Sequence, residues 1–122
     1  MQKWDVVRIY CDDLRTPHDK YCICICPERN WFYFINSEKP EFRKSRELAV
    51  SIESYEAVFL NRTSYVDTTT IQKFHSDQLN DCKSDNDRQC GPLLPAVRAR
   101  IQVAVGSHNA LNAAEVAAVL ND

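Results

Sequence analysis

The sequence predicts an α+β fold, a small and mainly β domain that carries helices at its C-terminal end. Two strand-like runs, residues 4–11 and 20–27, flank a polar loop. The second run is apolar at both alternating positions, so both of its faces need cover. Leu94, Val97 and Ile101 form an apolar stripe with helical spacing. Together these patterns favour a small sheet that curls into a barrel with a helix leaning on it.

Length and composition narrow the function classes. We expect one domain over residues 1–122, because a chain of this size buries a core without metal or disulfide staples. It has two glycines, Gly91 and Gly106, which excludes glycine-rich phosphate loops. The net charge of −2 argues against indiscriminate binding to nucleic acid. No apolar run reaches the ~20 residues that cross a bilayer, so we expect a cytoplasmic protein without membrane contact.

Six cysteines are present, and Cys22, Cys24 and Cys26 share one face of the second strand. Cysteines two apart on a strand do not easily close a disulfide, and no C-x-x-C pair marks a zinc site. We therefore expect reduced, mostly buried thiols, no bound metal and no other cofactor. Two alternatives stay open: a disulfide between Cys82 and Cys90, and an enzyme that uses the cysteine row on a metal.

The first half of the chain reads as strands. After the two opening runs, residues 27–30 are typical of a turn, and residues 30–36 form a third, aromatic-rich strand. This strand presents rings on both faces while one helix covers one face, which predicts a homodimer. Residues 37–40 end the strand at a proline, and residues 48–52 alternate as a fourth strand.

The second half begins less clearly. Residues 55–60 are ambiguous between a strand and a helical turn. Residues 64–68 favour a strand because they include aromatic Tyr65 and the β-branched Val66 and Thr68. Apolar anchors predict a short helix within residues 69–79. Residues 80–90 are polar without periodicity, and we expect a mobile loop there.

Two helices are predicted at the C-terminal end, over about residues 95–105 and 113–121. Pro95 suits the first helical position, and Gly106 is expected just after the end of this helix. Asn112 is the predicted cap of the second helix, because a glutamate three positions later completes the spacing of a capping box.

Several short segments, taken in order, resemble the MazF/PemK (Kid) toxins. The chain opens with Asp-Val-Val-Arg-Ile at residues 5–9, and an apolar strand at residues 21–25 follows a polar loop. Further matches follow in the same order: Ile35-Asn36-Ser37, then Leu60, Ser64-Tyr65-Val66, Gly91 with Leu93 or Leu94, and Ile101 with Val105. The resemblance spans most of residues 4–105.

The resemblance implies an SH3-like β-barrel with a C-terminal helix, usually a homodimer, that cleaves single-stranded RNA without a metal and has a cognate antitoxin. The reaction needs a group that removes the ribose 2′-hydroxyl proton and a cation for the charge that develops on the phosphate. The family uses an arginine and a threonine or serine there. This chain has Lys20 and Asn36 at those positions, and Asp67 aligns with an arginine of some members.

The candidate catalytic residues are therefore His18, Lys20, Asn36 and Ser37. Histidine is the side chain suited to proton transfer near neutral pH, so His18 is the candidate for that role. Lys20 supplies a cation, although a lysine cannot form the two parallel hydrogen bonds with which an arginine binds a phosphate. Asn36 and Ser37 stand where the resemblance implies the threonine at the end of the third strand.

Four basic residues are the candidate RNA-binding group. Arg15 shares a loop with His18, and Arg43, Lys44 and Arg46 stand together further along the chain. Two functions remain open. One is a toxin that cleaves or binds RNA and inhibits growth; the other is a catalytically inactive barrel that binds protein or nucleic acid.

Overall fold

The computed structural model describes residues 1–121 and contains two antiparallel sheets. The central sheet has five strands in the order β6-β3-β2-β1-β7, and the second sheet pairs two strands. The central strands are β1 (Asp5–Cys11), β2 (His18–Cys26), β3 (Trp31–Ile35), β6 (Gln72–Lys73) and β7 (Gln89–Pro92). The second sheet consists of β4 (Val50–Ile52) and β5 (Ser64–Val66).

Helices follow or interrupt the strands. The α-helices are α1 (Arg43–Leu48), α2 (Asn80–Ser84), α3 (Pro95–Gly106) and α4 (Ala113–Leu120). The 3-10 turns are η1 (Ser54–Glu56), η2 (Ser76–Leu79) and η3 (Asn86–Arg88). Within residues 1–121, every helix is too short or too polar to cross a bilayer.

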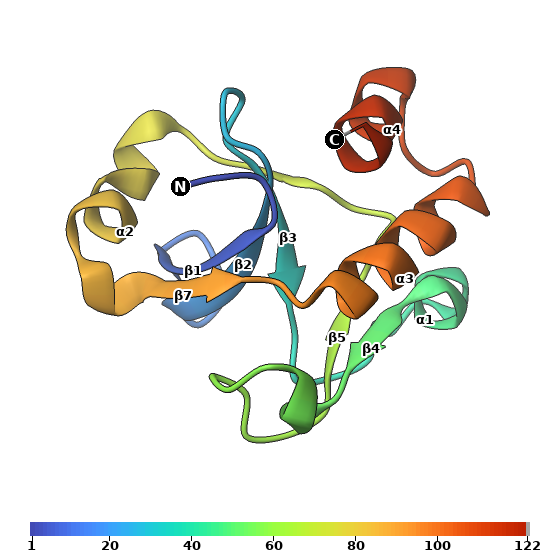
Figure 1. Cartoon of the computed structure of the whole chain (residues 1–122), viewed down its shortest axis with the longest axis horizontal. Helices are drawn as coiled ribbons and strands as arrows, with labels where there is room; N and C mark the ends of the chain where they lie inside the picture. The colour runs from blue at the N-terminus through green and yellow to red at the C-terminus, as the bar shows by residue number, and fades with distance from the viewer. Residues whose placement is uncertain (122) are drawn as a thin grey trace.

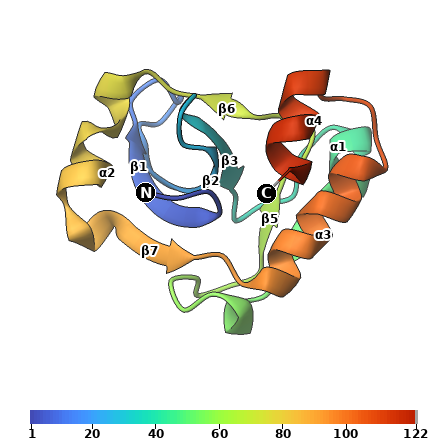
Figure 2. The same ribbon diagram turned by 45° about the horizontal axis from the view of Figure 1, so that its top comes forward.

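Both faces of the central sheet are covered, as the pattern of β2 predicts. On one face, Ile23 packs in a core cluster with Val97 and Ile101 of α3. On the other face, Cys22 packs in a second cluster with Leu79 at the end of η2. Figures 1 and 2 show these layers, with α2 on one side of the sheet and α3 and α4 on the other.

The strands form a mainly antiparallel α+β fold, but no closed barrel is found among residues 1–121. β6 and β7 are the edges of the central sheet, and a bridge between Asn36 and Tyr65 joins that sheet to the smaller one. The sheet stays open because η2 and α2 pack against it. Because these elements cover the second face of β2, the sheet does not have to curl round on itself to bury that face.

Three segments differ from the sequence-based expectations. Residues 80–90 are not a loop but hold α2, η3 and the start of β7, because Leu79 and Cys82 anchor this segment against the sheet. Residues 69–79 hold the short strand β6 and η2 instead of an α-helix. The basic stretch from Arg43 forms α1, a helix that the sequence does not predict and that buries no residue.

The C-terminal helices agree with the predicted ranges. Pro95 is the first residue of α3, and the Asn112 side chain caps α4 by accepting a hydrogen bond from the Glu115 amide at 2.8 Å. Gly106 is the last residue of α3 rather than the residue after it, and Ser107 follows as the C-cap.

The aromatic strand β3 is largely hidden within one chain. Phe32 and Tyr33 are fully buried, whereas Trp31 and Phe34 are half-buried. One face of this strand lies in the cluster under α3 and the other in the cluster under α2. The rings of β3 therefore give no reason for a dimer, and the homodimer stays a prediction.

Candidate functional site

A cleft lies where β2 and β3 part. Their pairing begins at Tyr21 and Ile35, and Asn36 then turns away to bridge Tyr65 of β5. Residues 18–20 remain paired with β1 on one side, and residues 59–64 return along the other. The resulting cleft has a volume of about 310 Å³ and contains these lining residues: His18, Asp19, Lys20, Tyr21, Ile35, Ser37, Phe59, Leu60, Asn61, Arg62 and Ser64.

Three of the four candidate catalytic residues line this cleft, and the fourth contacts one of them. His18, Lys20 and Ser37 are lining residues. Asn36 lies across from Lys20, and its side-chain oxygen Oδ1 accepts a hydrogen bond from the Lys20 ammonium. Residues 18–20 and 36–37, which are well separated in the sequence, are therefore brought together by the β2–β3 pairing.

Lys20 is a half-buried cation without an acidic partner. Its Nζ lies 5.0 Å from the centre of the Phe34 ring, and no ion pair involves this lysine within residues 1–121. Burial lowers the pKa of Lys20 from its usual 10.5 because the surroundings disfavour the charged form. An ammonium held in this way is complementary to an anion such as a phosphate group.

The ring of His18 is oriented by a local hydrogen bond. Nδ1 lies 2.6 Å from the carbonyl oxygen of Thr16, and since that oxygen only accepts, Nδ1 carries the proton. In the neutral ring, Nε2 then holds the lone pair and faces no partner among residues 1–121. This tautomer equips Nε2 to accept a proton from a bound ligand.

Arg62 is a cleft-lining residue that the sequence does not identify as a candidate. It lies on the exposed loop before β5 and lines the cleft opposite β2. Its ion pair with Glu38 is long, 3.7 Å from Nη2 to Oε1, and both side chains are mostly exposed. Such pairs contribute little, so the guanidinium is available to a ligand.

Asp19 is the acidic residue in the cleft wall, and two arginines neutralise it. Its Oδ1 accepts a hydrogen bond from Arg88 Nη1 at 3.0 Å, and its Oδ2 lies 3.3 Å from Arg8 Nε. Arg88 also donates to the carbonyl of Arg8. The carboxylate therefore does not cancel the positive charge of Lys20 and Arg62 in the cleft.

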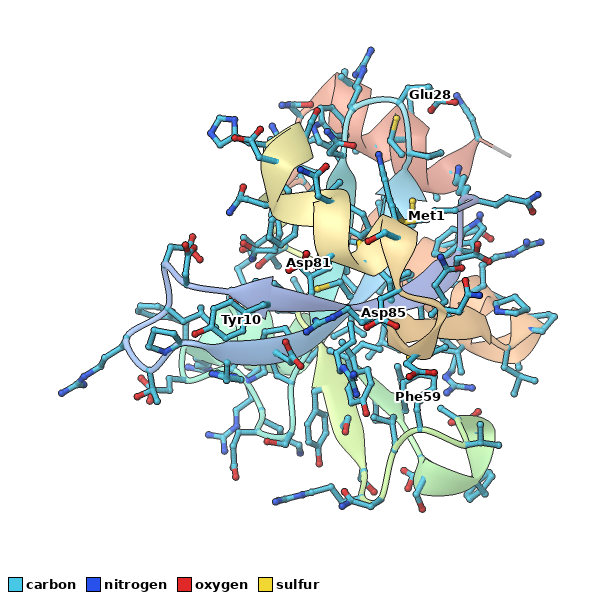
Figure 3. All side chains as sticks on the ribbon, turned by 90° about the vertical axis from the view of Figure 1, so that its left-hand side faces the viewer. Met1, Tyr10, Glu28, Phe59, Asp81 and Asp85 are labelled. Atoms are coloured by element: carbon cyan, nitrogen blue, oxygen red, sulfur yellow. The ribbon has the colours of Figure 1, made fainter. Side chains whose placement is uncertain are left out.

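An aromatic pair forms the apolar part of the cleft wall. The rings of Tyr21 and Phe59 have their centres 4.9 Å apart at an angle of 41°. Both residues are half-buried and line the cleft. Phe59 lies in the segment between η1 and β5, and Figure 3 shows it in the lower half of the view, with Glu28 at the top.

The candidate RNA-binding residues do not line the cleft. Arg15 is exposed in the loop between β1 and β2, and Arg43, Lys44 and Arg46 lie exposed on α1. Figures 1 and 2 show α1 beside α3, on the far side of the molecule from α2. Their contact with RNA stays a prediction.

The cysteines offer no second site. All six are free thiols, including Cys82 and Cys90. Burial raises the pKa of Cys11 to about 11 and that of Cys24 to about 12, so these thiols stay protonated at neutral pH. Within residues 1–121, no group of three or more His, Cys, Asp or Glu side chains is arranged to hold a metal ion.

Comparison with known proteins adds no assignment. Neither a scan against protein-family models nor a search of curated proteins gives a match to this chain. The cleft is therefore interpreted from its own residues.

Proposed function

We propose that this protein is a MazF/PemK-like toxin that binds single-stranded RNA in the cleft and cleaves it without a metal ion. The observation that carries the proposal is the half-buried ammonium of Lys20, which the Asn36 side chain holds at a cleft wall without an acidic partner in residues 1–121. The open sheet, with its C-terminal helix packed on one face, is in this proposal a partly open variant of the SH3-like barrel.

The residues support a simple cleavage step. Nε2 of His18 takes the proton of the ribose 2′-hydroxyl, whose oxygen then bonds to the adjacent phosphorus. Lys20 stabilises the negative charge on the phosphorane oxygens, and Ser37 orients the phosphate by hydrogen bonding. The bond from phosphorus to the 5′-oxygen breaks, and that oxygen takes a proton from solvent. The products are a 2′,3′-cyclic phosphate and a free 5′-hydroxyl.

A toxin of this kind would have a defined location, an antitoxin and an oligomeric state. The protein would work in the cytoplasm, where a cognate antitoxin would hold it inactive. It would form a homodimer, and two clefts in one particle would suit an extended strand of RNA. The basic residues Arg15, Arg43, Lys44 and Arg46 would then contact RNA outside the cleft through phosphate charge.

Cleavage of a labelled single-stranded RNA in the presence of EDTA tests the reaction. His18→Ala and Lys20→Ala should each reduce the cleavage rate at least about tenfold. Tenfold is a lower limit, because one positioned catalytic group usually contributes more. Lys83→Ala is the matched control, because this lysine is exposed on α2 and does not line the cleft. Unchanged cleavage by both cleft variants would contradict the proposed mechanism.

The second candidate function is a catalytically inactive module that binds RNA or protein. The observation in its favour is Asp67, where some toxins of this type have an arginine. The Asp67 carboxylate accepts hydrogen bonds from the Thr69 amide at 3.0 Å and hydroxyl at 2.5 Å, so it stabilises a turn. A folded wild-type protein that binds RNA in EDTA but leaves it intact would establish this function instead.

A further inference from the structure

We propose that Tyr21 and Phe59 form a platform on which one nucleobase of the bound RNA stacks, while Arg62 holds an adjoining phosphate. The inference rests on the proposed binding of RNA, and it adds that the cleft recognises a base and not the sugar-phosphate backbone alone. Neither aromatic residue is among the candidates that the sequence provides.

The two rings occupy the end of the core where the cleft opens. Tyr21 lies on the same face of β2 as Ile23 and Ile25, which are fully buried, yet Tyr21 is half-buried. Phe59 reaches this point from the loop before β5, and both rings pack on the core cluster under α3. One side of the pair therefore seals the core, and the other side borders the cleft.

The polar end of Tyr21 is free for a ligand. No hydrogen bond to its hydroxyl is present within residues 1–121. Tyr33, by contrast, donates its hydroxyl to the Thr68 carbonyl at 2.8 Å inside the core. A half-buried tyrosine with an unused hydroxyl offers a ring face for stacking and a polar group for a base edge.

Charge and size agree with a single stacked nucleotide. Lys20 and Arg62 line the same cleft as the aromatic pair, so cations border the rings. The volume of about 310 Å³ lies at the low end of the ~300–1,000 Å³ of small-molecule sites. This space suits one base and its phosphate, and stacking of this kind tolerates different bases because each has a π face.

Binding of two fluorescein-labelled oligomers, measured by anisotropy in EDTA, tests the platform. One is a single-stranded 2′-O-methyl RNA, which lacks the attacking hydroxyl, and the other has the same length and phosphates but abasic residues. The wild type should bind the base-containing oligomer at least about 5-fold more tightly, the low end for one stacked base. Tyr21→Leu and Phe59→Leu should abolish this preference, whereas Phe42→Leu, which changes an exposed ring outside the cleft, should keep it.

The Arg62→Gln variant tests the phosphate contact separately from the stacking of the base. It should weaken binding of both oligomers by the same factor and reduce the salt dependence of binding, because one phosphate contact is lost. The preference for bases should stay as in the wild type.

The outcomes distinguish this inference from the function on which it rests. A wild type that binds neither oligomer overturns the proposed RNA binding. A wild type that binds both equally leaves RNA binding intact and overturns the platform, even where a leucine variant does not fold. Leucine variants that fold, as judged by circular dichroism, and keep the wild-type preference also overturn it.

Discussion

Arg100 of α3 donates two parallel hydrogen bonds to the carboxylate of Glu56, at the end of η1. Nη1 donates to Oε2 at 3.0 Å and Nη2 donates to Oε1 at 2.7 Å, while Nη2 also donates to the Ser51 carbonyl at 3.1 Å. This contact ties the loop that carries Phe59 to the helix that covers the core. A charged pair therefore lies three residues before Phe59, which lines the cleft.

We expect Glu56→Gln to lower stability more at pH 7 than at pH 3. The hydrogen bonds from Arg100 lower the pKa of Glu56 below its ordinary value of 4.5. A carboxyl group with a lowered pKa stabilises the fold above the unfolded-state pKa, and this contribution is lost as the pH falls through the folded-state value. Urea melts at both pH values measure the effect. Equal losses at both pH values would show that the charge of Glu56 is not involved.

The sequence predicts most elements that bury a regular apolar face, and it misses those that do not. β2 and α3 follow from alternation and from the stripe of Val97 and Ile101. α1 buries no residue, so its basic sequence carries no amphipathic pattern. α2 is anchored by Leu79 and Cys82 within an otherwise polar stretch. Two apolar residues are too few to show the repeated spacing that predicts a helix.

The site follows the same rule. His18 and Lys20 are close in the sequence, and the resemblance to a known family connects them with Asn36. Arg62 lies alone in an exposed loop, and Phe59 lies in a segment without a clear period. Their place in the cleft results from the return of the chain toward β5, which local sequence patterns do not encode.

Ile23→Ala should destabilise the protein by about 2–5 kcal/mol, because it removes buried carbon atoms and leaves a cavity. Ile23 is fully buried on the central strand β2, in the core cluster that includes Val97 and Ile101 of α3. Val103→Ala is the matched control, since this valine is 73% exposed on α3 and should change stability by less than ~0.5 kcal/mol. Denaturant melts compare the two. A similarly small loss for Ile23→Ala would contradict the assigned core.

In the native protein, some thiols should react slowly and others rapidly with Ellman's reagent at pH 8. Cys11, Cys22, Cys24 and Cys82 are buried with raised pKa values, so they should react slowly. Cys26 is partly exposed and should react first. After denaturation without reductant, all six should titrate. Fewer than six would reveal a disulfide or another modification, contrary to the free thiols described above.

A homodimer is expected, although its surface differs from the aromatic strand that the sequence favours. Val58 is fully exposed and Leu94 is 44% exposed, and both line one pocket beside β7. Burying this apolar surface against a second copy would remove it from water. Light scattering should give about 28 kDa, twice the 14.1 kDa of one chain. Val58→Asp should shift the mass toward that of one chain, because it puts a charge into the contact. A wild-type mass near that of one chain throughout a dilution series would exclude the dimer.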